Sequence, residues 1–506
     1  MAGLKDGDDF KDGEFLKAPG LLKVVCLGVG VVLTAIFFLI AIFAPDQAGA
    51  MAYSWLFAVM FFLTLAVGGL FWTLLHHASN SGWGTVIRRL MENLGSLIPF
   101  MLLLGIPFLI PQLGFRDALW EWFPEREAAL HEAVEVAAEG KDAYQAKLTA
   151  KIEGANAEVE DARAELAALD SPSPGHRAHF QKKIEALEVE ATKLSKHDLS
   201  DEAILQELED KSFLDSATLL FIKRDYLNGG AWYLRYVFYL IVLTSIAYIL
   251  RAWSIKLDKD GDPKWFRWMR RWSCGFLPFF ATAWTFLVFD WLMALDYTWF
   301  STMWGVYLFA GAALNSMGVL VLIVTALRRA GYLKTVVTME HYHLMGKLML
   351  AFVIFWAYIA FSQFFLIWYA NITEETKFYL TRNTEFWNTY TITFLVLGHF
   401  FIPFAVLLLQ HVKKVPILLS GVAIWNLVMH VCDVYWIIIP DRGPSLTAGA
   451  GEAGISMTIP GAWLFDILAF LGVAGIFGYF LLRQLGSASL FPCRDPRLDE
   501  SLNVVN

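Results

Sequence analysis

The chain has 506 residues, of which 57% are hydrophobic and 15% aromatic, but only 17% are charged. A soluble domain cannot bury so much apolar surface, so this composition excludes a soluble enzyme and predicts a multi-pass membrane protein. The four cysteines stand singly, without CxxC or CxxCH spacing, which excludes an iron–sulfur cluster or a covalent c-type haem in this chain.

The chain begins with a charged segment of mixed sign, residues 1–21, which lacks a small-residue cleavage site before the first apolar run. We therefore expect no removable signal peptide. Ten apolar runs are long enough to cross a hydrocarbon core of about 30 Å. They lie at roughly 22–44, 51–75, 94–114, 231–252, 273–296, 301–327, 345–370, 386–411, 415–439 and 462–483.

The runs define the expected domains: spans one to three in 22–114, an insert in 115–230, spans four to ten in 231–484, and a C-terminal tail in 485–506. The apolar positions of the insert step mostly by three and four, with charged residues between them, and SPSPG interrupts the pattern. This predicts an extracytoplasmic helical hairpin. A solvated spacer or docking surface is the preferred role, because no residues of reactive spacing appear in it.

The charges of the short loops predict the orientation, because Lys and Arg are retained on the cytoplasmic side. The loops on the side of the N-terminus carry most of these residues, including Arg88, Arg89, Arg270 and Arg271. The opposite loops offer only Lys377, Arg382 and Arg442. With ten spans, both termini are expected in the cytoplasm.

Span nine contains the stretch NLVMHVCD, in which Asn426, His430 and Asp433 recur at i, i+4 and i+7. A helix places these three polar groups on one face. A His beside a carboxylate can relay a proton near neutral pH, and ionisable groups inside a membrane usually mark an ion route. The alternative is that the stripe only hydrogen-bonds helices together.

Other spans carry candidate partners for such a route. Asp290 lies in the outer half of span five, His399 lies in the middle of span eight, and Lys347 and Tyr358 share a stripe of span seven. We expect His430 and Asp433 to exchange protons outward, Asp290 to lie across the bundle interior, and the other three to extend the line toward the cytoplasm.

Membrane histidines also serve as haem ligands. His399 and His411 are 12 residues apart, about 120° around a helix, so they do not form a pair on one face. We expect no haem and no metal in this chain, although a single His–His ligand pair between helices stays open. Arg235 and Asp466 lie close enough to the membrane surface to be read as ordinary boundary residues.

Three long stretches carry a family resemblance: SWLFAVMFFLTLAVGGLFWTLLHH (54–77), FDWLMALDYTWFSTMWGVYLFAG (289–311) and HYHLMGKLMLAFVIFWAYIAFSQFFLIWYANITEET (341–376). With the ten-span layout, they resemble the second large membrane subunit of alternative complex III, a bacterial quinol:cytochrome c oxidoreductase. That subunit belongs to the NrfD-like superfamily of polysulfide reductase membrane anchors. The resemblance covers the whole chain except residues 115–230.

The resemblance implies an all-α integral membrane protein of the bacterial inner membrane, whose core is two four-helix bundles. It implies a haem-free subunit that supports quinol oxidation beside a sister NrfD-like subunit, with quinone as the possible cofactor. Iron–sulfur clusters and haem c would belong to partners: a molybdoenzyme-like peripheral subunit, a multihaem cytochrome c and a monohaem cytochrome c. The family's His-plus-carboxylate quinol site cannot be matched here residue by residue, so no quinone-binding or catalytic residue is assigned.

Two other functions compete with this interpretation. A purely structural anchor would use the polar stripes to hold helices together, without quinone or proton chemistry of its own. A secondary transporter would show an inverted repeat with broken helices. Gly and Pro interrupt only span three, at GIPFLIP, and the second half of the chain has no matching interruption, so the transporter ranks last.

Overall fold

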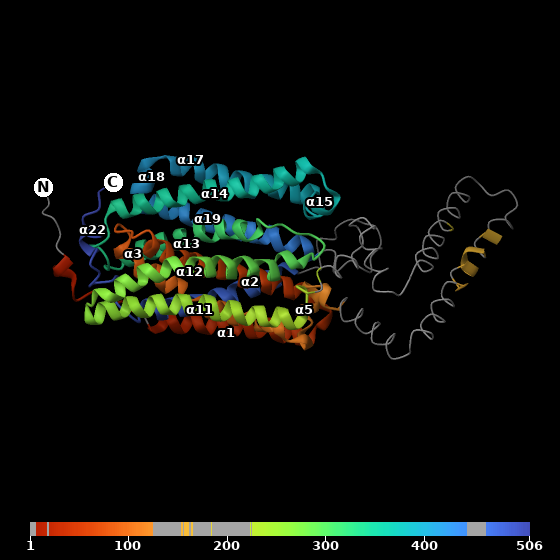
Figure 1. The fold of residues 1–506 in the computed structure, drawn as a ribbon, viewed down its shortest axis with the longest axis horizontal. Coiled ribbons are helices and arrows are strands. Elements are labelled where there is room, and N and C mark those ends of the chain that lie inside the picture. Colours follow the sequence, from red (N-terminus) through yellow and green to blue (C-terminus); the bar gives the residue numbers. More distant parts are fainter. Residues whose placement is uncertain are drawn as a thin grey trace. The chain divides into compact units, whose positions relative to one another are not determined.

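The computed structural model describes residues 7–17, 20–124, 225–442 and 462–505, together with a few isolated residues between 153 and 223. These residues form helices and turns, and the described part contains no strand. Ten helices in it are long and apolar enough to cross a membrane (Figure 1). The predicted all-α membrane fold with ten spans is therefore confirmed at this level.

The ten spans have the following bounds: Gly20–Phe43 (α1), Pro45–Ala78 (η2 and α2), Thr85–Leu109 (α3, α4 and η3), Gly229–Asp260 (α11), Pro263–Leu295 (α12 and η5), Trp304–Arg329 (α13), Met339–Ala370 (α14), Glu385–Leu408 (α16, η6 and α17), Pro416–Asp441 (α19 and η7) and Ala462–Leu485 (α21). The shorter elements include α5 (Phe115–Leu119), α15 (Thr373–Leu380), α18 (Gln410–Lys414) and α22 (Leu498–Leu502).

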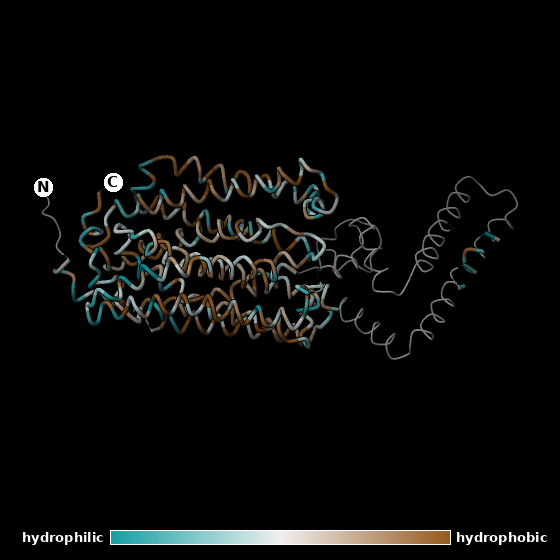
Figure 2. Tube along the Cα trace, viewed as in Figure 1, coloured by the Kyte–Doolittle hydropathy of each residue, from teal (hydrophilic) through white to brown (hydrophobic). Residues whose placement is uncertain are grey.

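The centre of the spans is formed by α2 (Ala48–Ala78) and α13, which are buried almost all around. Glycine allows their close contact, because a Cβ added at Gly68 would lie 2.2 Å from the Ala312 carbonyl oxygen. α13 also packs on α14 and α19, while α11 pairs with α12 and α1 with α21. Hydrophobic residues cover much of the outer helices in Figure 2.

The third span begins earlier than its hydrophobicity predicts and is interrupted. The expected start was near residue 94, but α3 (Thr85–Gly95) is helical and buried from Thr85 onward. Charged residues can lie inside this segment because they pair with one another, as described below. α4 (Ile98–Leu103) and the 3₁₀ segment η3 (Ile106–Leu109) follow, and the GIPFLIP interruption falls where the regular helix ends.

The eighth span contains an unusual segment, because η6 (Thr391–Phe401) is a π-helix between α16 (Glu385–Tyr390) and α17 (Ile402–Leu408). Pro403, the second residue of α17, has no N–H to donate back into this segment. The Gly398 carbonyl instead accepts a hydrogen bond of 2.8 Å from the Trp425 indole of α19. Such wide turns are rare and occur frequently at functional sites.

The two terminal segments lie together. The Leu490 amide donates to the Glu14 carbonyl at 2.7 Å, and the Glu14 carboxylate accepts from the Leu333 amide after α13 at 2.6 Å. The described residues of 1–121 and 226–506 form one compact unit. The predicted helical hairpin of residues 115–230 falls mostly outside the described residues.

Candidate functional site

The buried face of α19 carries the polar stripe predicted for span nine. Asp433 is enclosed by groups from two other helices: the Tyr307 hydroxyl of α13 donates to Oδ1 at 2.5 Å, and the Trp356 indole of α14 donates to Oδ2 at 3.2 Å. Asp433 is only 1% exposed. Three helices therefore converge on this carboxyl group.

His430 lies one turn earlier and connects Asp433 to α2. Its Nδ1 is 3.8 Å from Asp433 Oδ2, and its Nε2 is 2.9 Å from the Thr64 hydroxyl. The ring fits because residue 311 of α13 is a glycine: a Cβ there would lie 3.1 Å from His430 Cε1. The sequence of groups Thr64, His430, Asp433 and Tyr307 thus joins α2, α19 and α13.

Two further predicted residues lie beside this group. The His399 ring of η6 is centred 4.0 Å from the Trp356 ring and 6.4 Å from the His430 ring. His399 and Asn426 are fully buried, and within the described residues no protein group hydrogen-bonds to their side-chain polar atoms. Burying such atoms without partners costs free energy, so they are polar groups that the packing alone does not explain.

The buried face of α19 continues the polar line toward its N-terminus. The Ser420 hydroxyl donates to the Thr325 hydroxyl oxygen of α13 at 3.1 Å, and Thr325 is 3.1 Å from the Tyr342 hydroxyl of α14. Asn426 lies between this group and His430 along α19. Sequence reasoning missed Thr325, Tyr342 and Ser420, because each is a common residue in an apolar helix and only tertiary contact brings them together.

The other buried aspartates of the spans differ from Asp433. Arg235 of α11 pairs with both oxygens of Asp290, at 2.8 and 2.9 Å, and Tyr239 donates to the same carboxylate at 2.6 Å. Arg442 donates to Asp466 at 2.9 Å. Arginine remains protonated, so these two carboxylates have permanent counter-charges. Asp290 therefore belongs to a separate ion pair, and Arg235 and Asp466 are partners in such pairs rather than plain boundary residues.

Lys347 and Tyr358 do not join the cluster, contrary to expectation. Both lie on the exposed face of α14, and Tyr358 is 64% exposed. The buried face of this helix instead presents Trp356 to Asp433. Lys347 and Tyr358 do share one face of α14, as their spacing predicts. Periodicity cannot show which face of a membrane helix is buried when both faces are apolar.

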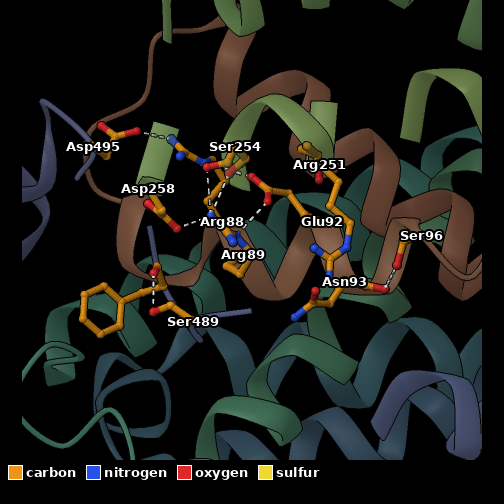
Figure 3. Close-up of polar contacts among 12 residues, drawn as sticks. Arg88, Arg89, Glu92, Asn93, Ser96, Arg251, Ser254, Asp258, Ser489 and Asp495 are labelled. Carbon is orange, nitrogen blue, oxygen red and sulfur yellow. Dashed lines mark hydrogen bonds and ion pairs between the residues drawn. The ribbon is translucent and has the colours of Figure 1, made fainter. Parts of the chain in front are cut away.

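A second polar cluster lies around α3, at the end of the spans near the two terminal segments (Figure 3). Arg88 pairs with Glu92 at 3.2 Å and with Asp495 at 2.5 Å, while Arg89 pairs with Glu92 at 3.0 Å and with Asp258 at 2.6 Å. The side chains of both arginines are fully buried. Their charge alone predicted that Arg88 and Arg89 lie in a short loop, so the sequence did not predict this buried cluster.

Sequence offered one signal for the Arg88 cluster: Arg88 and Glu92 are four residues apart and therefore adjacent on a helix. Its remaining partners come from distant segments. Ser254 and Asp258 lie in the last two turns of α11, and Asp495 belongs to the C-terminal tail. Outside the spans, burial and the nearby Asp258 raise the pKa of Cys493, two residues before Asp495, to about 11.

Comparison with known proteins provides no independent assignment, since no family model and no curated protein matches this chain. Among the described residues, no three His, Cys, Asp or Glu side chains are arranged to hold a metal ion. The function must therefore be argued from the two buried polar clusters and from the membrane fold.

Proposed function

We propose that this chain is the haem-free membrane subunit of a quinol-oxidising respiratory complex, similar to alternative complex III, and that it conducts protons along α19. The observation that carries the proton role is the environment of Asp433. Its nearby basic group is His430, whereas Asp290 and Asp466 are paired with arginines. A histidine partner can itself gain and lose a proton near neutral pH, whereas an arginine partner stays protonated.

In this mechanism Asp433 Oδ2 and His430 Nδ1, which are 3.8 Å apart and not hydrogen-bonded to each other, must approach to exchange a proton, while the Thr64 hydroxyl binds the other ring nitrogen. Tyr307 and Trp356 stabilise the carboxylate form by donating to it. Asn426 supplies polar atoms on α19 between this pair and the hydroxyls of Ser420 and Thr325. His399 supplies two ring nitrogens beside His430. A proton can then enter or leave at either end of the line.

A quinone ring does not fit this cluster. Tyr307, Trp356, His399 and His430 are all buried, and the rings of Trp356 and His399 are in direct contact. We therefore assign quinol oxidation to the complex as a whole and place no quinone at these residues. Electrons would pass to iron–sulfur and haem groups of partner subunits.

The remaining features belong to the same proposal. Both termini lie on the cytoplasmic side of the bacterial inner membrane, and the spans form two four-helix bundles. Residues 115–230 are expected on the extracytoplasmic side, against the redox subunits. The side-by-side terminal segments are consistent with termini on one side of the membrane.

Removing residues 125–210 should loosen subunit association, and an intact, fully active complex would contradict this role.

The test is to replace Asp433 by Asn and His430 by Phe, separately, in the complete complex. We expect fewer protons released per quinol oxidised in proteoliposomes, with assembly retained in Asp433→Asn because an amide can still accept from Tyr307. Cys432→Ser, on the same helix but outside the cluster, is the matched control. An unchanged proton stoichiometry in both variants would refute the proton role.

A structural anchor without proton chemistry remains the second candidate. One observation favours it: Asp433 accepts hydrogen bonds from α13 and α14 and so ties three helices together. This function predicts loss of assembly in Asp433→Ala. It also predicts normal quinol oxidation and proton release in every variant that does assemble.

A further inference from the structure

The hairpin of α11 and α12 carries a basic and aromatic surface that the proposed function does not use. The first three turns of α12 expose Arg267, Arg270 and Arg271, and beside them the indoles of Trp268 and Trp272. Within the described residues, no hydrogen bond or ion pair involves Arg270 or Arg271. Arg267 has only an electrostatic interaction with Asp262 in the hairpin turn.

This charge pattern is unfavourable for the isolated helix. Arg267 and Arg271 are like charges at i and i+4, so they lie side by side on one face of α12 and repel each other. The acids of the turn are already engaged, because Asp262 interacts with Arg267 but pairs with Lys264 at 2.8 Å, and Asp260 accepts from the Trp265 indole at 2.8 Å. An anion from outside the chain would supply the missing counter-charge.

The depth of these residues is given by the apolar run that follows them. No charged residue occurs between Trp272 and Phe289. The segment from Trp272 to Leu292, whose one charged residue, Asp290, is paired with Arg235, is long enough at 1.5 Å per residue to cross a core of about 30 Å. Arg270 and Arg271 therefore lie where this helix leaves the hydrocarbon, at the level of the lipid phosphates.

Tryptophans surround the same level. The Trp268 ring is 5.6 Å from Trp253 of α11 and 5.5 Å from Trp265, centre to centre, and the ammonium groups of Lys256 and Lys264 lie 4.7 and 5.0 Å from the Trp265 ring centre. Indoles with an apolar body and a polar N–H favour the membrane–water boundary. The basic side chains and the indole rings thus both mark the membrane–water boundary at this end of α11 and α12.

Below the arginines, the exposed surface has room for hydrocarbon. Cys274 and Gly275 are exposed, and a Cβ added at Gly275 would meet no atom within 4 Å. Phe279, 59% exposed, lies one turn further along the helix. We propose that this surface binds an anionic membrane phospholipid: Arg267, Arg270 and Arg271 bind its phosphate, and an acyl chain lies along Gly275 and Phe279.

The site is independent of quinol and proton chemistry. Native mass spectrometry of the purified full-length protein, released from nanodiscs of phosphatidylethanolamine with phosphatidylglycerol or cardiolipin, measures which lipids stay bound. Wild type should retain the anionic lipid. The variant Arg267→Gln/Arg270→Gln/Arg271→Gln should reduce that retention roughly tenfold or more, given the attraction of each basic residue to an anionic surface.

Two further variants separate a built site from general attraction. Arg329→Gln/Lys334→Gln/Arg483→Gln removes three exposed charges elsewhere and should retain the lipid. Gly275→Leu keeps every charge but fills the space of the acyl chain, and should reduce retention. The proposal is overturned if both triple variants lose lipid equally, if Gly275→Leu has no effect, if excess inorganic phosphate displaces the lipid, or if the first triple variant loses a co-purified protein instead of lipid.

Discussion

The three buried aspartates of the spans show that the partner of a residue, rather than its type, decides its role. Asp290 and Asp466 are held by arginines, while Asp433 is held by neutral donors and a histidine. The spacing of Asn426, His430 and Asp433 predicted their common buried face correctly. The arginine partners of the other two could not be predicted, because Arg235 and Asp290 meet only when α11 packs on α12.

This difference predicts opposite responses to the same substitution. Asp290→Asn leaves the Arg235 guanidinium without its counter-charge and should lower the free energy of unfolding by about 3 kcal/mol, as for other broken buried ion pairs. Asp433→Asn leaves no unpaired permanent charge and should lower it by less, about 1 kcal/mol. Unfolding of the purified protein in detergent measures both, and an equal loss in the two variants would contradict the distinction.

At the scale of the helices, hydrophobic runs were sufficient to predict ten spans, but not their irregularities. The start of α3 was misplaced because charged residues ended the apolar run, although they are buried as pairs. The π-helix η6 leaves no pattern of its own in sequence: Pro403 signals a missing hydrogen bond, but only contact with Trp425 shows where the freed carbonyl of Gly398 is used. The close approach of two helices at a glycine likewise leaves no pattern in the sequence, because it depends on which helices pack together.

Gly68 tests that approach. In Gly68→Ala the new methyl group would overlap the Ala312 backbone, which cannot move away as a side chain can, so α2 and α13 must separate. We expect a loss of about 1–3 kcal/mol in the free energy of unfolding. Gly421→Ala is the control, because a Cβ there meets nothing within 4 Å, and it should be neutral or stabilising by about 1 kcal/mol. A neutral Gly68→Ala would show that the contact is looser than described.

On the scale of the whole molecule, segments far apart in the chain close the same end. The Ser501 hydroxyl of α22 donates to the Trp83 carbonyl at 2.6 Å, Asp495 binds Arg88, and Leu490 binds Glu14. The C-terminal tail is therefore part of the fold and not an appendage. The loop charges and the even number of spans predicted a cytoplasmic tail but gave no sign of this packing.

Cys493 reports on that packing through its reactivity. Its raised pKa, about 11, leaves little thiolate at pH 7.5, and the rate of maleimide labelling should rise about tenfold per pH unit below that pKa. In a variant whose other cysteines (Cys26, Cys274 and Cys432) are replaced by Ala, labelling at pH 7.5 should be slow and should accelerate when Asp495→Ala releases the tail. Rapid labelling without that change would mean that the tail is not held as described.

The pairing of Arg88 with Asp495 also has a consequence for biogenesis. The two residues are 407 positions apart, so the third span is synthesised long before this counter-charge exists. Until the ribosome reaches residue 495, Arg88 can pair with Glu92 but not with Asp495. The final state of an early membrane helix thus depends on a residue that is made after all ten spans, and a chain truncated before residue 495 would contain these spans and still lack the partner that completes its third.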